Sequence, residues 1–205
     1  SEGVDLTGSY VKSISNGQGN CYPITVFSGS TRTGIGCGTS PGSSGDLIIQ
    51  QIFPYQAWGT KFLTAPSSND AGPNATSNMT NIYRVLVKDP TTIVKRNGVT
   101  LTGIVNNRYY QYESNTPDYI ETNKPSLMAM YMSSGGNCSN TSGDGDPEMF
   151  YLSPLEQSIK STQFYRNNLT AIDWNFVTFV IPNTGLSSLK IDGLSYLTYP
   201  IAERF

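Results

Sequence analysis

The chain has 205 residues, a formal net charge of -2, 14% charged residues and no histidine. It has no basic run to neutralise phosphates, so nucleic acid is not an expected partner. No apolar stretch approaches the ~18 residues that span a bilayer, so the chain is not expected to cross a membrane. Without histidine, neither a Ser-His-Asp nor a Cys-His site can be built from this chain alone. No signal peptide opens the sequence, and Ser1 is expected to be a mature start.

Turn-forming residues and aromatic strand formers dominate the composition, which predicts an all-β fold. In the N-terminal part we expect strands at residues 9–14 and 22–27, a turn at residues 28–30 and a return strand at residues 31–37. The strongest signal follows at residues 46–53 (DLIIQQIF), a short isoleucine-rich run that Pro54 ends. Trp58-Gly59 comes directly after, and Trp58 is expected either to close one end of a core or to stack on a ligand.

The middle of the chain predicts further short strands and one tight hairpin. Asn97-Gly98 stands between two β-branched runs, and both residues of such a turn need positive φ. The strands are expected at residues 61–65, 82–87, 92–94, 99–101, 119–121 and 125–132. Residues 103–112 are expected to form a loop and a strand that ends in Tyr109, Tyr110 and Tyr112.

The C-terminal part predicts strands at residues 148–152 and 175–181, and a hairpin over 189–197 that turns on Asp192-Gly193. Residues 155–162 fit either a helical turn or a strand. The segments 81–101 and 175–197 share one order of strand, proline turn and Asn/Asp-Gly hairpin. We therefore expect one module over residues 1–205, of two packed antiparallel β-sandwich-like units, with two similar halves that meet near residues 113–124. Chance similarity between β meanders is the alternative.

In a secreted protein, three cysteines suggest one disulfide and one free thiol, or a partner for the third cysteine outside this sequence. Cys21 and Cys37 flank an expected hairpin, so they are predicted to pair, which leaves Cys138 free.

Two polar loops carry possible ligand and modification sites. Asp144, Asp146 and Glu148 alternate in GDGDPE, and the two aspartates could offer oxygen ligands to Ca²⁺. The EF-hand pattern is absent, and a solvated turn is the alternative. Five Asn-X-Ser/Thr sequons occur, about as many as this composition gives by chance. They lie at Asn74, Asn78, Asn137, Asn140 and Asn168.

Aromatic side chains form the other candidate binding site. Trp58, Tyr109, Tyr110 and Tyr112, with Trp174, could form an exposed platform for sugars or peptides. Packing within the sheet is the alternative, because aromatic cross-strand pairs are common in β-structure. A glycosidase would need two positioned carboxylates, and the sequence cannot place any two of them together.

Several stretches together resemble the IgG Fc-binding protein N-terminal domain family. The residues that carry the resemblance are ITVFSGSTRT from Ile24, GDLIIQQIFPYQAWGTKFLTAP from Gly45, YRVLV and TTIV from Tyr83, KPSLMAMYM from Lys124, GDPEMFYLSPLEQ from Gly145, NFVTFVI and LKIDG. The resemblance covers residues 24–193. The chain lacks a dense cysteine framework and so looks more like a bacterial surface-adhesin branch.

The resemblance implies an extracellular or cell-surface module without catalytic residues, flanked by other domains in a larger protein. Its expected role is adhesion or binding, with a glycan or glycoprotein as the partner. The alternating acidic residues at Asp144 and Asp146, and not the resemblance, make Ca²⁺ the one candidate cofactor. The alternatives are a carbohydrate-active enzyme or its accessory domain, and a structural spacer.

Overall fold

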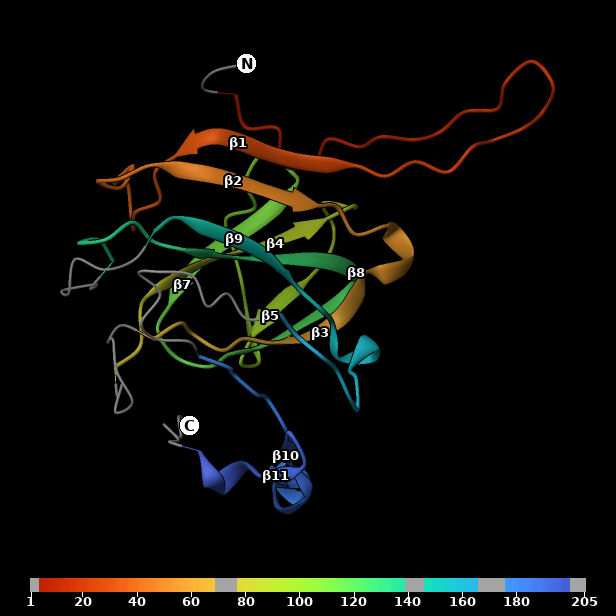
Figure 1. Cartoon of the computed structure of the whole chain (residues 1–205). Helices are drawn as coiled ribbons and strands as arrows, with labels where there is room; N and C mark the ends of the chain where they lie inside the picture. Colours follow the sequence, from red (N-terminus) through yellow and green to blue (C-terminus); the bar gives the residue numbers. More distant parts are fainter. Residues whose placement is uncertain (1–3, 69–76, 139–145, 166–175, 200–205) are drawn as a thin grey trace.

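The computed structural model describes residues 4–68, 77–138, 146–165 and 176–199, and it is an all-β protein with antiparallel pairing (Figure 1). The expected fold class is confirmed. Helical structure in the described residues consists of short 3-10 turns. They are η1 (Tyr55–Ala57), η2 (Leu155–Gln157), η3 (Asn183–Ser188) and η4 (Tyr196–Thr198). None of the helices in these ranges is long and apolar enough to cross a membrane.

The strands form a seven-stranded sheet, a two-stranded ribbon and a small hairpin. The ribbon pairs β1 (Phe27–Thr33) with β2 (Asp46–Gln51), and the hairpin pairs β10 (Lys190–Ile191) with β11 (Leu194–Ser195). The large sheet contains β3 (Gly59–Leu63), β4 (Asn81–Val87), β5 (Val94–Arg96), β6 (Val99–Thr100), β7 (Tyr109–Ser114), β8 (Tyr119–Met132) and β9 (Glu148–Leu152).

Strand β8 is the axis of the large sheet. It has 14 residues and joins two segments that were expected as separate strands. One edge of β8 pairs with β4 and then β5, and the other edge pairs with β9 and then β3. Strands β7 and β6 extend the first edge through β4 and β5. Both halves of β8 therefore have neighbours on each side.

The two halves of β8 meet at an irregular stretch around Pro125. The register with β3 passes from Gly59 opposite Ser126 to Lys61 opposite Glu121, so β8 holds extra residues here. Proline has no N–H to give to the ladder and is tolerated at such bulges. The Thr122 hydroxyl donates to the Lys124 carbonyl at 2.8 Å and so binds a backbone acceptor within the bulge.

The curled sheet encloses the main hydrophobic core. Alternate residues of β4 and β8 point into it, and nearly all of its side chains are fully buried. The core consists of Phe62, Tyr83, Val85, Val87, Val94, Tyr110, Ile120, Met128 and Met130. The sequence predicted most of these positions as apolar faces of strands, because the side-chain period of a strand is two.

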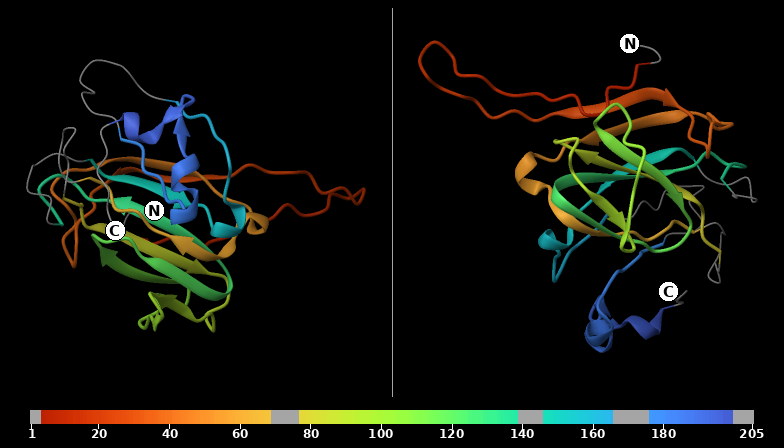
Figure 2. Two further views of the ribbon diagram at one scale, coloured as in Figure 1. Left: turned by 90° about the horizontal axis from the view of Figure 1, so that it is seen from below. Right: turned by 180° about the vertical axis from the view of Figure 1, so that it is seen from behind.

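The β1–β2 ribbon covers the opposite face of β4, β8 and β9. Ile48 of β2 packs there with Ile82, Ala129 and Met149. Figure 2 shows the ribbon on one side of the large sheet and the hairpin β10–β11 on the other. The turn expected at residues 28–30 is wrong, since these residues lie inside β1. Gly29 is needed there because an added Cβ would lie 2.0 Å from the Ile48 carbonyl oxygen.

The predicted disulfide was also wrong. Cys37 is bonded to Cys138, with Cα atoms 5.1 Å apart, and Cys21 is free and exposed. The segment before Cys37 is tied to the end of β8, where the Ser134 N–H donates to the Ile35 carbonyl at 2.8 Å. Cys21 instead lies on an arm that projects from the ribbon, so closeness in sequence was a poor guide.

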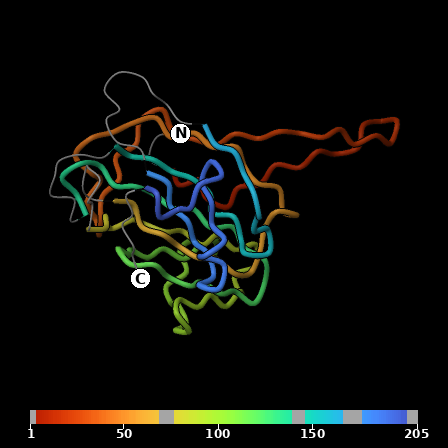
Figure 3. The backbone as a smooth tube through the Cα atoms, turned by 60° about the horizontal axis from the view of Figure 1, so that its bottom comes forward, coloured from red at the N-terminus to blue at the C-terminus, as the bar shows by residue number. Residues whose placement is uncertain are grey.

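Three expected strands do not form. Residues 9–14 and 22–26 make up the two sides of the projecting arm, whose exposed tip turns at Asn16 with its N–H bonded to the Asn20 carbonyl (Figure 3). Residues 176–180 are exposed and Ile181 is half-buried, and none of them is assigned to a strand. Strand-forming composition does not by itself make a strand, which needs a hydrogen-bonded neighbour.

Both predicted tight hairpins are confirmed. Asn97 and Gly98 have φ of 50° and 83° between β5 and β6, and Asp192 and Gly193 have φ of 51° and 79° between β10 and β11. The proposed duplication of the two halves stays a prediction.

Candidate functional site

A pocket of about 560 Å³ opens beside the bulge of β8. This volume lies within the ~300–1,000 Å³ that is common for ligand sites. Three parts of the chain build it: the η1 segment, the β4–β5 loop and the middle of β8. Its lining consists of Tyr55, Trp58, Lys88, Asp89, Thr92, Lys124 and Pro125.

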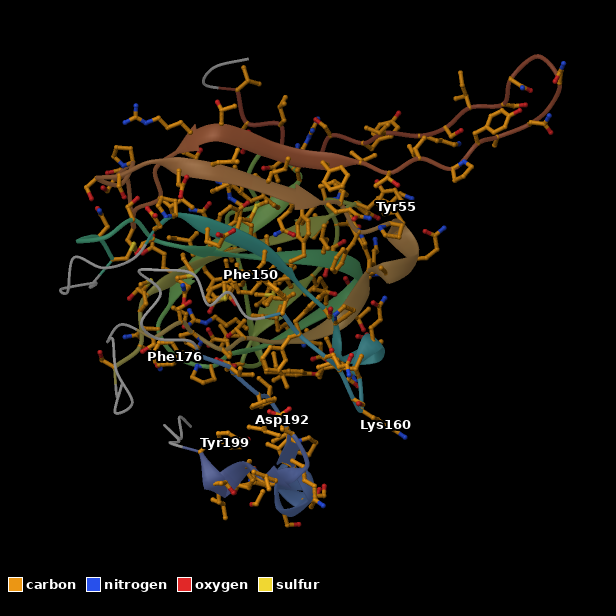
Figure 4. The ribbon with its side chains drawn as sticks, in the orientation of Figure 1. Tyr55, Phe150, Lys160, Phe176, Asp192 and Tyr199 are labelled. Carbon is orange, nitrogen blue, oxygen red and sulfur yellow. A yellow bond between two sulfur atoms is a disulfide. The ribbon has the colours of Figure 1, made fainter. Side chains whose placement is uncertain are left out.

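The aromatic wall comes from the turn that follows β2. Strand β2 ends at Gln51, and Pro54 precedes η1 in an extended conformation. The η1 turn then brings the rings of Tyr55 and Trp58 together in an edge-on arrangement, with ring centres 4.7 Å apart. Glycine is required at position 59, because an added Cβ there would lie 2.3 Å from the Pro154 Cβ. The glycine after Trp58 thus lets the chain pass close to Pro154, the residue before η2. Trp58 is half-buried, while Tyr55 is 49% exposed. Tyr55 is labelled in Figure 4.

The second wall is a loop held by its own side chains. The Asp89 carboxylate accepts from the N–H and the hydroxyl of Thr91, both at 2.8 Å, which is the pattern of an Asx turn. The Thr92 hydroxyl donates to the Asp89 carbonyl at 2.7 Å. The Tyr110 hydroxyl donates to the Thr92 carbonyl at 3.2 Å, so the main core supports this wall from behind.

The charges of the pocket come from two lysines and one aspartate. Lys124 donates to Asp89 and to the Thr91 hydroxyl, the latter at 2.7 Å. Hydrogen bonds from Lys124 and then Thr91 lower the pKa of Asp89 to about 2. Lys88 has no carboxylate partner among the described residues; its ammonium stands 4.6 Å from the centre of the Tyr55 ring. The pocket therefore carries a net positive charge in a chain of net charge -2.

A smaller hollow of about 280 Å³ lies over the neighbouring part of β5 and β8. Ile93, Lys95, Glu121, Thr122 and Asn123 line it. Lys95 and Lys61 both stand directly opposite Glu121, on the two strands that flank β8. Its one carboxylate is thus flanked by two cations.

Of the four aromatic residues expected to bind, only Trp58 lies at the pocket. Tyr109 and Tyr110 are 4% and 9% exposed, so the expected exposed platform is not there. Tyr112 stacks on Tyr83 with ring centres 5.0 Å apart, and burial raises its pKa well above the usual range. Strand β7 is covered on one face by the core and near Tyr109 by the N-terminal segment, where the Tyr109 hydroxyl donates to Asp5 at 2.7 Å.

The predicted calcium site remains untested. Asp144 lies outside the described residues, as does Trp174, while Asp146 is exposed. No group of three or more His, Cys, Asp or Glu side chains suited to a metal occurs within the described ranges. Of the five sequons, Asn78 and Asn137 are described; their amides donate to the Asn115 carbonyl at 3.0 Å and to the Ser43 hydroxyl at 2.9 Å.

Sequence reasoning did not identify Tyr55, Lys88, Asp89 and Lys124 as site residues. Two local signals were available. Asp89 two residues before Thr91 predicts an Asx turn, and a proline inside an apolar strand, Pro125, predicts a bulge. Neither signal shows that the two features meet at η1, since their contact depends on the path of β8.

Comparison with known proteins identifies the family. A family model described as IgGFc binding protein matches residues 1–202. The chain belongs to this IgGFc-binding family. Comparison with the curated proteins gave no match, and neither did comparison with the solved structures. Membership indicates an extracellular binding module, and the Cys37–Cys138 disulfide fits an oxidising compartment.

Proposed function

We propose that this chain is a non-catalytic adhesion module of a secreted or cell-surface protein, which recognises a glycan or a protein through the pocket of Tyr55 and Trp58. The observation that carries the proposal is the pocket itself. It joins an exposed aromatic ring to a lysine without a carboxylate partner in the described chain, on walls held by hydrogen bonds and by the core. Aromatic anchors with a few polar groups are typical of recognition sites.

The charge pattern of the pocket supports binding over catalysis. Hydrolysis of a glycoside needs one carboxyl group that holds a proton and a second one several Å away. The described lining of the pocket has one carboxylate, Asp89, and Lys124 and Thr91 lower its pKa to about 2. An acid of this pKa is ionised at neutral pH and is unsuited to protonate a leaving group.

The family extends the list of candidate partners. Its name refers to the Fc part of immunoglobulin G, which is a reason to include that glycoprotein among the probes. Attachment to further domains, the relation to a bacterial surface-adhesin branch and Ca²⁺ binding near Asp144 and Asp146 belong to the same proposal.

The test compares two tyrosine variants. Tyr55→Ala removes the exposed ring of the pocket, and Tyr165→Ala removes a ring that is 89% exposed and does not line the pocket. Both variants and the parent protein are assayed against a glycan array and a panel of host glycoproteins that includes immunoglobulin G. We expect Tyr55→Ala to weaken binding about tenfold or more, as for a truncated aromatic anchor, and Tyr165→Ala to leave it unchanged.

Two results would contradict the proposal. If both variants bound equally well, the recognition site would lie outside the pocket. If the parent protein bound none of the probes, a structural spacer would be favoured instead.

A further inference from the structure

Lysines gather around the bulge of β8. Four of the seven lysines in the chain lie there: Lys61, Lys88, Lys95 and Lys124. Three of them stand beside carboxylates, since Lys124 pairs with Asp89 and the other two flank Glu121. Lys88 is the exception, since it has no partner among the carboxylates that the structure describes.

The position of Lys88 makes it part of a composite surface with Tyr55. The ammonium 4.6 Å from the ring centre is attracted to the negative face of the ring, which holds the flexible lysine in the pocket. An exposed ring and an adjacent ammonium together fit a ligand that is flat and apolar on one side and negative at one end. A pyranose ring with a carboxylate or a sulfate has this form, because its axial C–H groups present an apolar face.

The carboxylate of Asp89 favours an acidic sugar over an acidic peptide as the ligand. Its carboxylate lines the same pocket, and its low pKa keeps it negative at neutral pH. It can accept hydrogen bonds from hydroxyl groups, whereas it repels a second anionic group brought close to it. A sugar supplies several hydroxyl donors besides its one charge. A run of glutamates supplies negative charges and acceptors.

We infer that the pocket binds one acidic sugar residue, with its ring against Tyr55, its carboxylate or sulfate at Lys88 and a hydroxyl at Asp89. This inference rests on the proposed function and names the ligand class for the same pocket. The carboxylate and the sulfate share the chemistry that Lys88 recognises, so the two sources are separated by experiment.

The experiment measures binding of four probes by titration calorimetry at low salt. Sialyllactose supplies the carboxylate, a sulfated lactose supplies the sulfate, lactose is the neutral counterpart and hexaglutamate is the acidic peptide. We expect one or both acidic sugars to bind at least tenfold more tightly than lactose. We expect added salt to reduce this preference, because the charge on Lys88 is exposed to solvent.

Two lysine variants locate the preference. Lys88→Gln removes the charge at the pocket, and Lys160→Gln removes the same charge from an exposed site that lies well away from Tyr55 in Figure 4. We expect Lys88→Gln to abolish the preference, so that the acidic sugars bind no more tightly than lactose. Lys160→Gln should behave as the parent protein. An unchanged melting temperature shows that both variants are folded.

Each contrary outcome has a distinct meaning. Equal binding of lactose and the acidic sugars, lost in Tyr55→Ala, would overturn the acidic ligand class while the proposed function stands. Binding of hexaglutamate as tight as that of the acidic sugars would make the partner an acidic peptide. A preference that survives Lys88→Gln would remove this residue from the site. If all four probes fail while a glycoprotein from the panel binds through Tyr55, the acidic-sugar inference is wrong and the proposed function remains.

Discussion

The sheet around β8 and the projecting segments of this chain use similar residues with opposite results. Strand β4 (NIYRVLV) and the segment that begins NFVTFVI at Asn175 are both rich in β-branched and aromatic residues, yet β4 is largely buried between two neighbours and residues 176–180 are exposed. The exposed arm over residues 9–26 gives the same contrast. Hydrogen-bonded pairing and burial, and not strand propensity, therefore decide which β-rich segments become strands here.

The Cys37–Cys138 disulfide gives the largest expected effect, because it ties the segment after β1 to the end of β8. It closes a loop of 101 residues, for which loop-closure entropy predicts about 4–5 kcal/mol of stabilisation. The double variant Cys37→Ser/Cys138→Ser should therefore unfold at much lower urea concentration. Cys21→Ser, on the arm, should unfold as the parent does.

If Cys21→Ser unfolded at much lower urea concentration and the double variant unfolded as the parent does, the arm would be the part of the chain that a disulfide anchors. Mass spectrometry of the unreduced protein provides an independent check, since alkylation should mark Cys21 and should not mark the other two cysteines.

Truncation of one phenylalanine in each region gives the next largest effect. Phe62 in β3 is completely buried in the main core, so Phe62→Ala should lower the free energy of unfolding by about 3–5 kcal/mol. Phe179 is 43% exposed, and Phe179→Ala should change it by less than about 0.5 kcal/mol. Urea denaturation measures both. A cost for Phe179→Ala as large as that for Phe62→Ala would mean that the C-terminal segment is packed in solution.

The buried carboxylate of Asp118 tests the polar part of the same region. Its Oδ1 accepts a hydrogen bond from the Asn97 amide at 2.7 Å. The same oxygen lies 3.0 Å from Arg96 Nε. The Nε–H is not aligned for a hydrogen bond, so this contact is an ion pair. Arg96 is partly exposed, which weakens the pair. Asp118→Asn should cost about 1–3 kcal/mol through the lost charge at a buried site.

Asp192→Asn is the matched control for Asp118. Asp192 is exposed and has φ of 51° in the β10–β11 turn, a conformation that asparagine also adopts. Its substitution should change the free energy of unfolding by less than about 0.5 kcal/mol. A neutral result for Asp118→Asn would show that the network around it is dispensable for stability.

The parts of the fold that were predictable depend on local chemistry. Asn97-Gly98 and Asp192-Gly193 need positive φ whatever surrounds them. The parts that were not predictable depend on contacts between distant residues. The Cys37–Cys138 bond follows from the way residues near Ile35 return to the end of β8, over about a hundred residues of chain.

The candidate site shows the same limit. Trp58 stood out in the sequence because tryptophan is rare in this chain, and it does line the pocket. The tyrosines of β7 stood out equally, but burial depends on which faces β4 and β8 cover. Lys88 and Lys124 look like ordinary surface lysines in the sequence. They acquire a role only because the bulge at Pro125 and the loop after β4 meet beside η1.

The smallest expected effect concerns the Asp89–Lys124 pair, which lies where the well-packed sheet meets the proposed ligand. The folded-state pKa of Asp89 is about 2, below the ordinary value of 3.8, so its stabilising contribution is present above about pH 4 and is lost as pH falls towards 2. The pair is exposed, so the change in overall stability is expected to be slight. The carboxylate titration followed by NMR is the sensitive measurement. Lys124→Met should move the midpoint upwards towards 3.8, and Lys160→Met should leave it in place. If Asp89 of the parent protein titrated near 3.8, the hydrogen bonds that hold this wall of the pocket would be absent in solution. The β4–β5 loop would then be as poorly anchored to the sheet as the projecting arm.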